Sequence, residues 1–107
     1  MVDQAVIDSI KRYLDVLVEH GINAQKAILF GSYARGDART SSDIDILVLA
    51  EEFDHNRWSK EDELWKLTRK TDLRIQPVPV GPVQFIEDDV SPVIEMARRE
   101  GIEITRN

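Results

Sequence analysis

The chain has 107 residues, an apolar fraction of 42%, a net charge of -6 at pH 7 and no cysteine. This length suffices for one hydrophobic core, so residues 1–107 are expected to form a single domain. The lack of cysteine excludes disulfides, thiolate metal sites and a cysteine nucleophile. The acidic balance argues against a protein that grips nucleic acid, because such binding depends on Lys and Arg neutralising phosphates.

No stretch approaches the ~20 consecutive apolar residues of a membrane span. The start, Met1-Val2-Asp3-Gln4, lacks the basic residues and apolar run of a signal peptide. We therefore expect a cytoplasmic protein with no membrane partner.

The first half of the chain predicts one helix and two strands. Apolar residues recur at helical spacing until His20-Gly21, which predicts an amphipathic helix over residues 3–20. Two apolar runs then predict strands at 26–30 and 43–49. The polar segment 51–56 is expected to be a loop.

The second half predicts two helices and a further strand. Ser59 is expected to cap a helix that runs to Arg69-Lys70, because its first turn is acidic and its last turn is basic. Residues 73–80 predict a third strand, whose prolines confine its latter half to a sheet edge. Ser91-Pro92 predicts a helix start and Gly101 its end, and residues 102–104 alternate like a short strand or a docked tail. This order of elements favours a compact α/β domain.

The stretch of residues 31–47 carries the chemistry. Gly31-Ser32 follows the first predicted strand, and Asp43-Ile44-Asp45 enters the second. Side chains two apart on a strand share a face, so the two aspartates project together. At about 4 Å and an effective dielectric near 20 they would repel by roughly 4 kcal/mol. This pair therefore predicts a bound cation, for which Mg²⁺ carrying nucleotide phosphates is the natural choice.

The glycine and serine predict a cradle for those phosphates. Gly31 permits close backbone approach, and Ser32 is expected to cap a short helix whose first N–H groups point outward. Asp-Ile-Asp-Ile alone would equally fit a half-exposed strand with solvated aspartates. Together with the upstream Gly-Ser, the pattern favours a binding site over solvated aspartates.

These residues resemble the nucleotidyltransferase superfamily that includes DNA polymerase beta, and most closely its minimal (MNT) branch. The family pattern is matched by Gly31-Ser32, by Ala34-Arg35-Gly36 and by Ser42-Asp43-Ile44-Asp45. The resemblance implies a small mixed sheet packed against helices, a nucleoside triphosphate substrate and two Mg²⁺ ions. It also implies that Gly31 and Ser32 hold phosphates and that Asp43 and Asp45 hold metal.

A third carboxylate normally completes the acceptor-side metal in this chemistry. Asp72, Arg74 and Gln76 are expected to share a face of the third strand. The resemblance places an acidic residue where this chain has Gln76, which brings a carbonyl oxygen but no charge. Asp72 is the alternative, although it would lie about 6.5 Å away along the strand. We favour Gln76 as the metal-facing residue, level with Asp45.

Five further side chains have expected roles or positions. Arg35 is expected to reach phosphate or to pair with an acidic residue of the following loop. Ser42 is a candidate hydrogen-bond donor that orients Asp43. Tyr33 is as consistent with a core aromatic as with a wall of the nucleotide pocket. Two tryptophans, Trp58 and Trp65, are expected in the core or in an interface.

The resemblance implies an enzyme that moves an AMP or other NMP from its triphosphate to a hydroxyl, with release of pyrophosphate. Members of the minimal branch commonly act with a HEPN-domain protein as the antitoxin of a toxin–antitoxin pair. We therefore expect a HEPN partner and a homo- or hetero-oligomer. The alternative is an interaction module that binds nucleotide and masks its partner without turnover.

Overall fold

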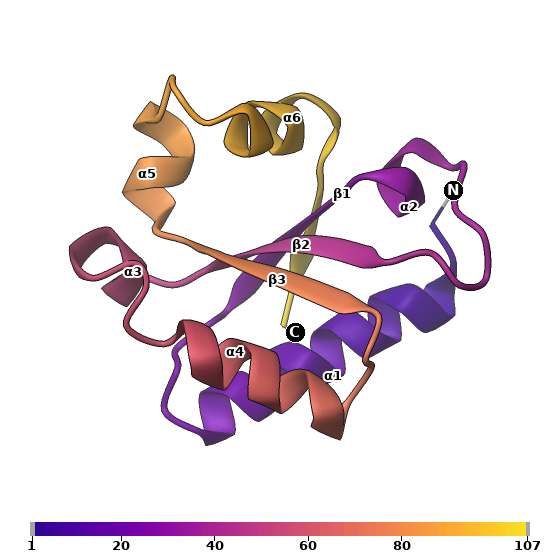
Figure 1. Ribbon diagram of the computed structural model, residues 1–107, viewed down its shortest axis with the longest axis horizontal. Helices are drawn as coiled ribbons and strands as arrows, with labels where there is room; N and C mark the ends of the chain where they lie inside the picture. Colours follow the sequence, from indigo (N-terminus) through magenta and orange to yellow (C-terminus); the bar gives the residue numbers. More distant parts are fainter. Residues whose placement is uncertain (1, 107) are drawn as a thin grey trace.

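The computed structural model describes residues 2–106, and its centre is a four-stranded mixed sheet (Figure 1). The strand order is β3-β2-β1-β4. β1 pairs antiparallel with both β2 and β4, whereas β2 and β3 are parallel. The strands are β1 (Lys26–Phe30), β2 (Ile44–Leu49), β3 (Ile75–Val80) and β4 (Ile102–Thr105). The predicted strands are therefore confirmed, and the alternating segment after Gly101 is a strand.

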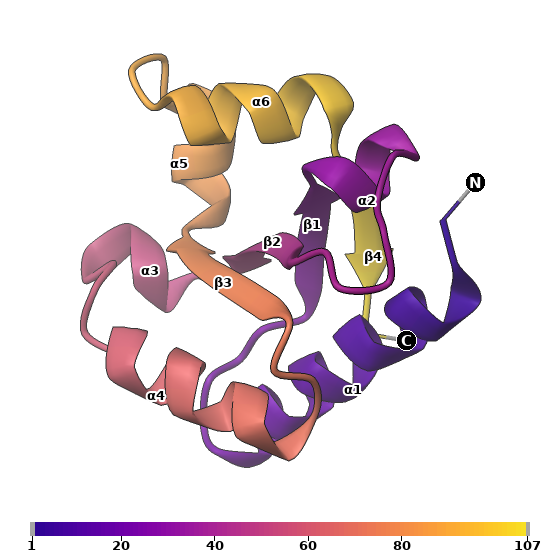
Figure 2. The same ribbon diagram turned by 45° about the vertical axis from the view of Figure 1, so that its right-hand side comes forward.

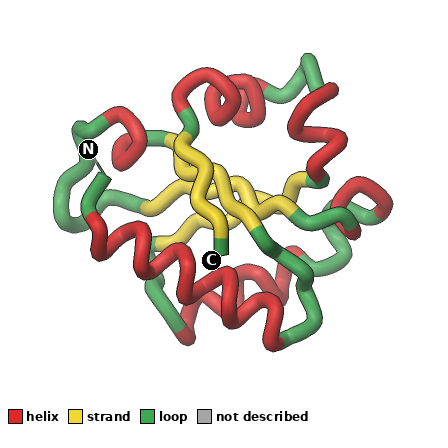
Figure 3. The backbone as a smooth tube through the Cα atoms, turned by 180° about the vertical axis from the view of Figure 1, so that it is seen from behind, coloured by secondary structure: helices red, strands yellow, loops and turns green. Residues whose placement is uncertain are grey.

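Helices cover both faces of this sheet, as seen from the front and from behind (Figures 1 and 3). One face packs against α1 and α4, and the other against α5 and α6 (Figure 2). The helices are α1 (Gln4–Glu19), α2 (Ser32–Arg35), α3 (Glu52–His55), α4 (Glu61–Leu67), the 3-10 helix η1 (Thr68–Lys70), α5 (Pro82–Glu87) and α6 (Pro92–Glu100).

The alternation along β2 divides the hydrophobic core into two clusters. Ile44, Ile46 and Val48 pack into the larger cluster with α1 and α4. Leu47 and Leu49 point to the opposite face and join the smaller cluster with Ile94 and Ala97 of α6. Asp45 belongs to this second face by the same alternation. The sheet therefore presents Asp45 on its α6 side.

The first helix forms as its sequence predicts. Asp3 is the N-cap residue, and its carboxylate accepts the Ala5 N–H at 2.9 Å. Val6, Ile10 and Leu14 are buried, as the helical spacing requires. The helix ends before Gly21, which adopts a φ of 87°.

Two boundaries differ from the prediction in the segment between β2 and α4. The expected loop at 51–56 contains the short helix α3, because Phe53 is buried in the larger core cluster. Ser59 does not cap α4, which begins at Glu61 with Lys60 in the cap position. The Ser59 hydroxyl instead donates to the Asn56 carbonyl at 3.1 Å, so it serves the preceding turn.

The tryptophans are not core residues, which corrects that alternative. Trp58 is 53% exposed and Trp65 is 42% exposed. The guanidinium of Arg57 lies 4.5 Å from the centre of the Trp58 ring and donates to the Pro79 carbonyl at 2.7 Å. This pairing occupies a carbonyl of β3, the edge strand, whose prolines at 77 and 79 offer no N–H to a further strand.

Candidate functional site

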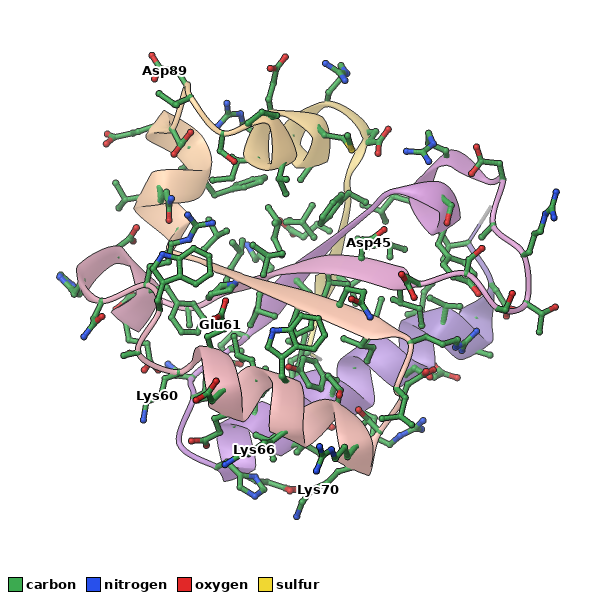
Figure 4. The ribbon with its side chains drawn as sticks, viewed as in Figure 1. Asp45, Lys60, Glu61, Lys66, Lys70 and Asp89 are labelled. Atoms are coloured by element: carbon green, nitrogen blue, oxygen red, sulfur yellow. The ribbon has the colours of Figure 1, made fainter. Side chains whose placement is uncertain are left out.

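The two aspartates lie where β2 begins. β2 starts at Ile44, so Asp43 is the last residue before the strand and Asp45 lies inside it. Asp43 is exposed, whereas Asp45 is half-buried. Figure 4 shows Asp45 on the side of β2 that faces α6, and the labelled lysines of the α4 region lie on the other side of the sheet.

An open cleft of about 380 Å³ brings most of the predicted site together. Its walls come from the end of β1, from α2, from the start of β2 and from α6. The lining residues are Phe30, Gly31, Ser32, Arg35, Ser42, Asp43, Asp45 and Met96. All predicted site residues except Asp72 and Gln76 therefore line one cleft.

The electrostatics of Asp45 suit a cation. Burial raises the pKa of this carboxyl, the nearby charge of Asp43 raises it further, and Arg35 lowers it. Burial and a like charge both disfavour the ionised form, and a bound dication would reverse that preference. Two oxygen ligands of this kind, with phosphate oxygens and water completing the shell, fit Mg²⁺. Within residues 2–106 no group of three or more His, Cys, Asp or Glu side chains is placed to hold a metal.

Gly31 packs directly against Asp45. It has φ 79° and ψ -153°, a conformation that L side chains rarely adopt. A Cβ at this position would lie 2.5 Å from Asp45 Oδ2. Gly31 also takes the N-cap position of α2, and the helix begins at Ser32. No side chain caps this helix with a hydrogen bond. The expectation that Ser32 caps this helix is therefore wrong, because the glycine precedes it in the cap.

Glu100 is a neighbour of the site that the sequence did not reveal. Its Oε1 accepts the Gly31 N–H at 3.0 Å and the Arg35 guanidinium at 3.2 Å. Arg35 also contacts Asp37 of the following loop at 3.5 Å, which is the acidic partner expected for it. One signal could have drawn attention to Glu100: an acidic residue at a helix C-terminus is unfavourable with the helix dipole and calls for a cationic partner.

Asp72 lies apart from the cleft, which corrects its expected place on the third strand. β3 begins at Ile75, because Asp72 forms a turn in which its side chain accepts the Arg74 N–H at 3.0 Å. The Arg74 guanidinium donates to both carboxylate oxygens of Asp72, from Nε to Oδ1 at 3.0 Å and from Nη2 to Oδ2 at 2.8 Å. These hydrogen bonds lower the pKa of Asp72 despite its partial burial. Asp72 is therefore engaged by a cation of its own chain.

Gln76 lies next to Asp45 in the sheet. The parallel register pairs Asp45 with Gln76 and Ile44 with Ile75. Paired residues on neighbouring strands point to the same face, so the Gln76 side chain emerges beside Asp45. The position of Gln76 level with Asp45 agrees with the expectation from the sequence.

Two smaller expectations concern Ser42 and Tyr33. The Ser42 hydroxyl accepts the Arg39 N–H at 2.8 Å, which shapes the loop, and its donation to Asp43 stays a prediction. The Tyr33 ring packs against the larger core cluster and lines a separate cavity with Arg74. Tyr33 is thus an aromatic residue packed against the core, and it does not line the aspartate cleft.

Comparison with known proteins places these features in a family. The family model of the nucleotidyltransferase domain matches residues 9–102. A proposed protein adenylyltransferase of Methanocaldococcus jannaschii is 24% identical over 99 residues, which are 92% of this chain and 95% of that protein.

Two solved structures share the fold. A proposed nucleotidyltransferase from Sulfolobus solfataricus superposes with a TM-score of 0.60 at 17% identity, over 92% of this chain and 78% of that one. A chain of a toxin–antitoxin structure solved with AMP-PNP gives a TM-score of 0.57 at 27% identity, over 92% of this chain and 71% of that one. Within residues 2–106, no helix has both the length and the apolar character to cross a bilayer. The matched family model spans most of the chain, and the chain therefore belongs to the nucleotidyltransferase domain family of enzymes.

Proposed function

We propose that this nucleotidyltransferase moves AMP from ATP to a hydroxyl group on a partner protein, in a reaction that depends on Mg²⁺. The acceptor oxygen would form a bond to the α-phosphorus, the bond from that phosphorus to pyrophosphate would break, and the hydroxyl proton would pass to water. The observation that carries the proposal is the half-buried Asp45, packed on Gly31 with Asp43 beside it in one cleft.

The residues of the cleft divide the work of binding. Asp43 and Asp45 would hold the metal, and Gly31 and Ser32 line the space for the β- and γ-phosphates. Mg²⁺ bound there would neutralise phosphate charge and lower the pKa of the acceptor hydroxyl. A second ion on the acceptor side would rely on Gln76 in place of a third carboxylate, because Asp72 is held by Arg74.

The choice of AMP and of a protein acceptor draws on the relatives. The matched protein of M. jannaschii is named for protein adenylylation, and a structural neighbour comes from a toxin–antitoxin structure with AMP-PNP. We therefore propose that the chain is an antitoxin whose partner and acceptor is a HEPN-domain toxin. The complex of the two would be a hetero-oligomer.

A second function is favoured by one observation, the neutral Gln76 beside Asp45. A chain without a third carboxylate could keep nucleotide binding and act by masking its partner. Incubation with α-labelled ATP, Mg²⁺ and a HEPN partner separates the two functions. Label on the partner supports transfer, whereas a tight complex without label supports masking.

Asp43→Asn is the control for this experiment, because it removes the negative charge of a proposed metal ligand at an exposed position. If the labelled partner appears with this variant as readily as with the wild type, the aspartate pair is not the transferase site.

A further inference from the structure

The segment that carries Asp43 is a loop, so something must hold this carboxylate in place. Residues 37–43 connect α2 to β2 and lie outside regular helices and strands. Asp43 itself is exposed. A metal ligand displaced by about 1 Å can cost on the order of a hundredfold in rate, so such a loop requires support from its neighbours.

Arg74 contacts this segment on both sides of Asp43. Its guanidinium Nη1 donates to the Thr40 carbonyl at 3.2 Å, and its own backbone carbonyl accepts the Ile44 N–H at 2.8 Å. The residue therefore joins the chain before Asp43 to the chain after it. The side chain and the backbone of Arg74 together fix the positions of Thr40 and Ile44, between which Asp43 lies.

Tyr33 strengthens the same connection. Arg74 Nη1 donates to the Tyr33 hydroxyl at 3.0 Å, and that hydroxyl donates to the Arg39 carbonyl at 3.1 Å. The loop closes on itself through Ser42, whose N–H donates to the Arg39 carbonyl at 2.9 Å. Arg74 and Tyr33 thus reach the loop at two successive carbonyls.

Asp72 fixes the direction in which Arg74 points. It binds Nε and Nη2 at 3.0 and 2.8 Å, which leaves Nη1 directed at Tyr33 and Thr40. A planar guanidinium can make this fork and still donate from its third nitrogen, whereas a lysine ammonium cannot.

We propose that Arg74, oriented by Asp72, is a positioning residue that places Asp43 for metal binding. The inference rests on the proposed function only in taking Asp43 as a metal ligand. Partners that orient metal ligands typically contribute 10–100-fold to metal affinity. Asp72 then has a role in the site without touching the metal.

The test compares Arg74→Lys with the wild type in two measurements. Binding of Mn²⁺ in the presence of AMP-PNP, followed by electron paramagnetic resonance, should weaken about 10–100-fold. Hydrogen exchange at the Ile44 amide, measured without metal, should become faster. Arg106→Lys is the matched control, because Arg106 pairs with Asp15 at 2.6 Å away from the cleft, and it should change neither quantity.

Two further variants separate positioning from a general loss of structure. Tyr33→Phe keeps the ring in the core and removes the hydroxyl bridge, so it should weaken Mn²⁺ binding by a smaller factor. In an Asp43→Ala background, Arg74→Lys should cause no additional loss of Mn²⁺ affinity, because the ligand that it positions is already gone.

Several results would overturn the inference. They are unchanged Mn²⁺ affinity in both Arg74→Lys and Tyr33→Phe, a full additional loss in the Asp43→Ala background, or no Mn²⁺ binding by the wild type. A wild type that binds Mn²⁺ with AMP-PNP but transfers no label would contradict the proposed transferase function and leave the role of Arg74 standing.

Discussion

At the scale of single residues, the site depends on which side chains face Asp45. Gln76 emerges beside it in the parallel register, and Asp72 is turned into a fork with Arg74. In the proposed function, the metals would therefore have two carboxylates, Asp43 and Asp45, and the amide oxygen of Gln76 as ligands from this chain. Turnover should be limited by the missing charge.

Gln76→Glu is expected to increase AMP transfer, because it adds a charged ligand next to Asp45. Asp72→Asn should lower transfer by about tenfold through Arg74, since partners of this kind contribute 10–100-fold and the asparagine keeps one acceptor. Rates of label transfer to the HEPN partner measure both effects. A loss of several orders of magnitude in Asp72→Asn, with no gain in Gln76→Glu, would make Asp72 the third carboxylate.

The raised pKa of Asp45 predicts a pH dependence of stability. The folded state holds this proton at a pH where an unfolded aspartate, with a pKa of about 3.9, has lost it. The free energy of unfolding therefore falls as the pH rises from about 4 through the folded pKa. The Asp45→Asn variant should not show this fall in the free energy of unfolding, because asparagine does not ionise.

Urea unfolding in EDTA measures the difference between the wild type and Asp45→Asn across this range. The wild type should become less stable relative to the variant as the pH rises. Asp72 has a lowered pKa in both proteins, so its contribution, lost only at more acidic pH, cancels. A difference that stays constant with pH would speak against the burial of the Asp45 charge.

At the scale of elements, α6 matters to the site through its last residue. Gly101 packs so closely on Ala97 and Ile28 that a side chain there would displace the helix end. This packing holds Glu100 at the Gly31 N–H. The C-terminal end of α6 is thus fixed against the start of α2.

Substitutions at Glu100 should separate its two hydrogen bonds. Glu100→Gln keeps an acceptor for the Gly31 N–H and loses the ion pair with Arg35, which is worth about 0–1 kcal/mol at a partly exposed position. Glu100→Ala leaves the buried Gly31 N–H without this acceptor, at a cost of about 1–3 kcal/mol. Denaturant unfolding should rank wild type, Gln and Ala in that order, and equal stabilities for the Gln and Ala variants would contradict it.

The sequence predicted those elements whose signals are local. Strand β1 is a run of buried apolar residues, and α1 has one apolar stripe, so both were found within about a residue. Helix α5 was missed, because Val83 and Ile86 are exposed and show no buried stripe. Its first N–H groups are capped by Asp54, which lies about thirty residues away.

The same reason explains what was missed in the site. Asp43, Asp45, Gly31 and Ser32 form one local pattern, and they line one cleft. The contacts of Arg74 with Tyr33 and of Glu100 with Gly31 join positions 41 and 69 residues apart. No spacing rule reaches that far, so only the folded chain reveals the residues that support the pattern.

At the scale of the whole molecule, helices cover both faces of the sheet (Figure 1). The aspartate cleft lies where β1 ends and β2 begins. The repulsion between Asp43 and Asp45 opposes this folded state when no cation is present. Binding of the proposed cation would therefore stabilise the folded state.

Mg²⁺ with ATP should raise the melting temperature, and Asp43→Asn/Asp45→Asn should abolish that rise. Without metal, the double variant should be at least as stable as the wild type, because the like charges are gone. Scanning calorimetry with and without Mg-ATP gives both values. A large loss of stability in the metal-free double variant would show that the aspartates are structural.

The hydrogen bond between Gly31 and Glu100 also has a consequence for the order of events during synthesis. The two residues are 69 positions apart, and ribosomes add about 5–20 residues per second, so Glu100 is made roughly 3 to 14 seconds after Gly31. β4, which pairs with the outer side of β1, follows it. A nascent chain therefore holds both aspartates and the Gly-Ser motif for seconds before Glu100 is available to accept the Gly31 N–H.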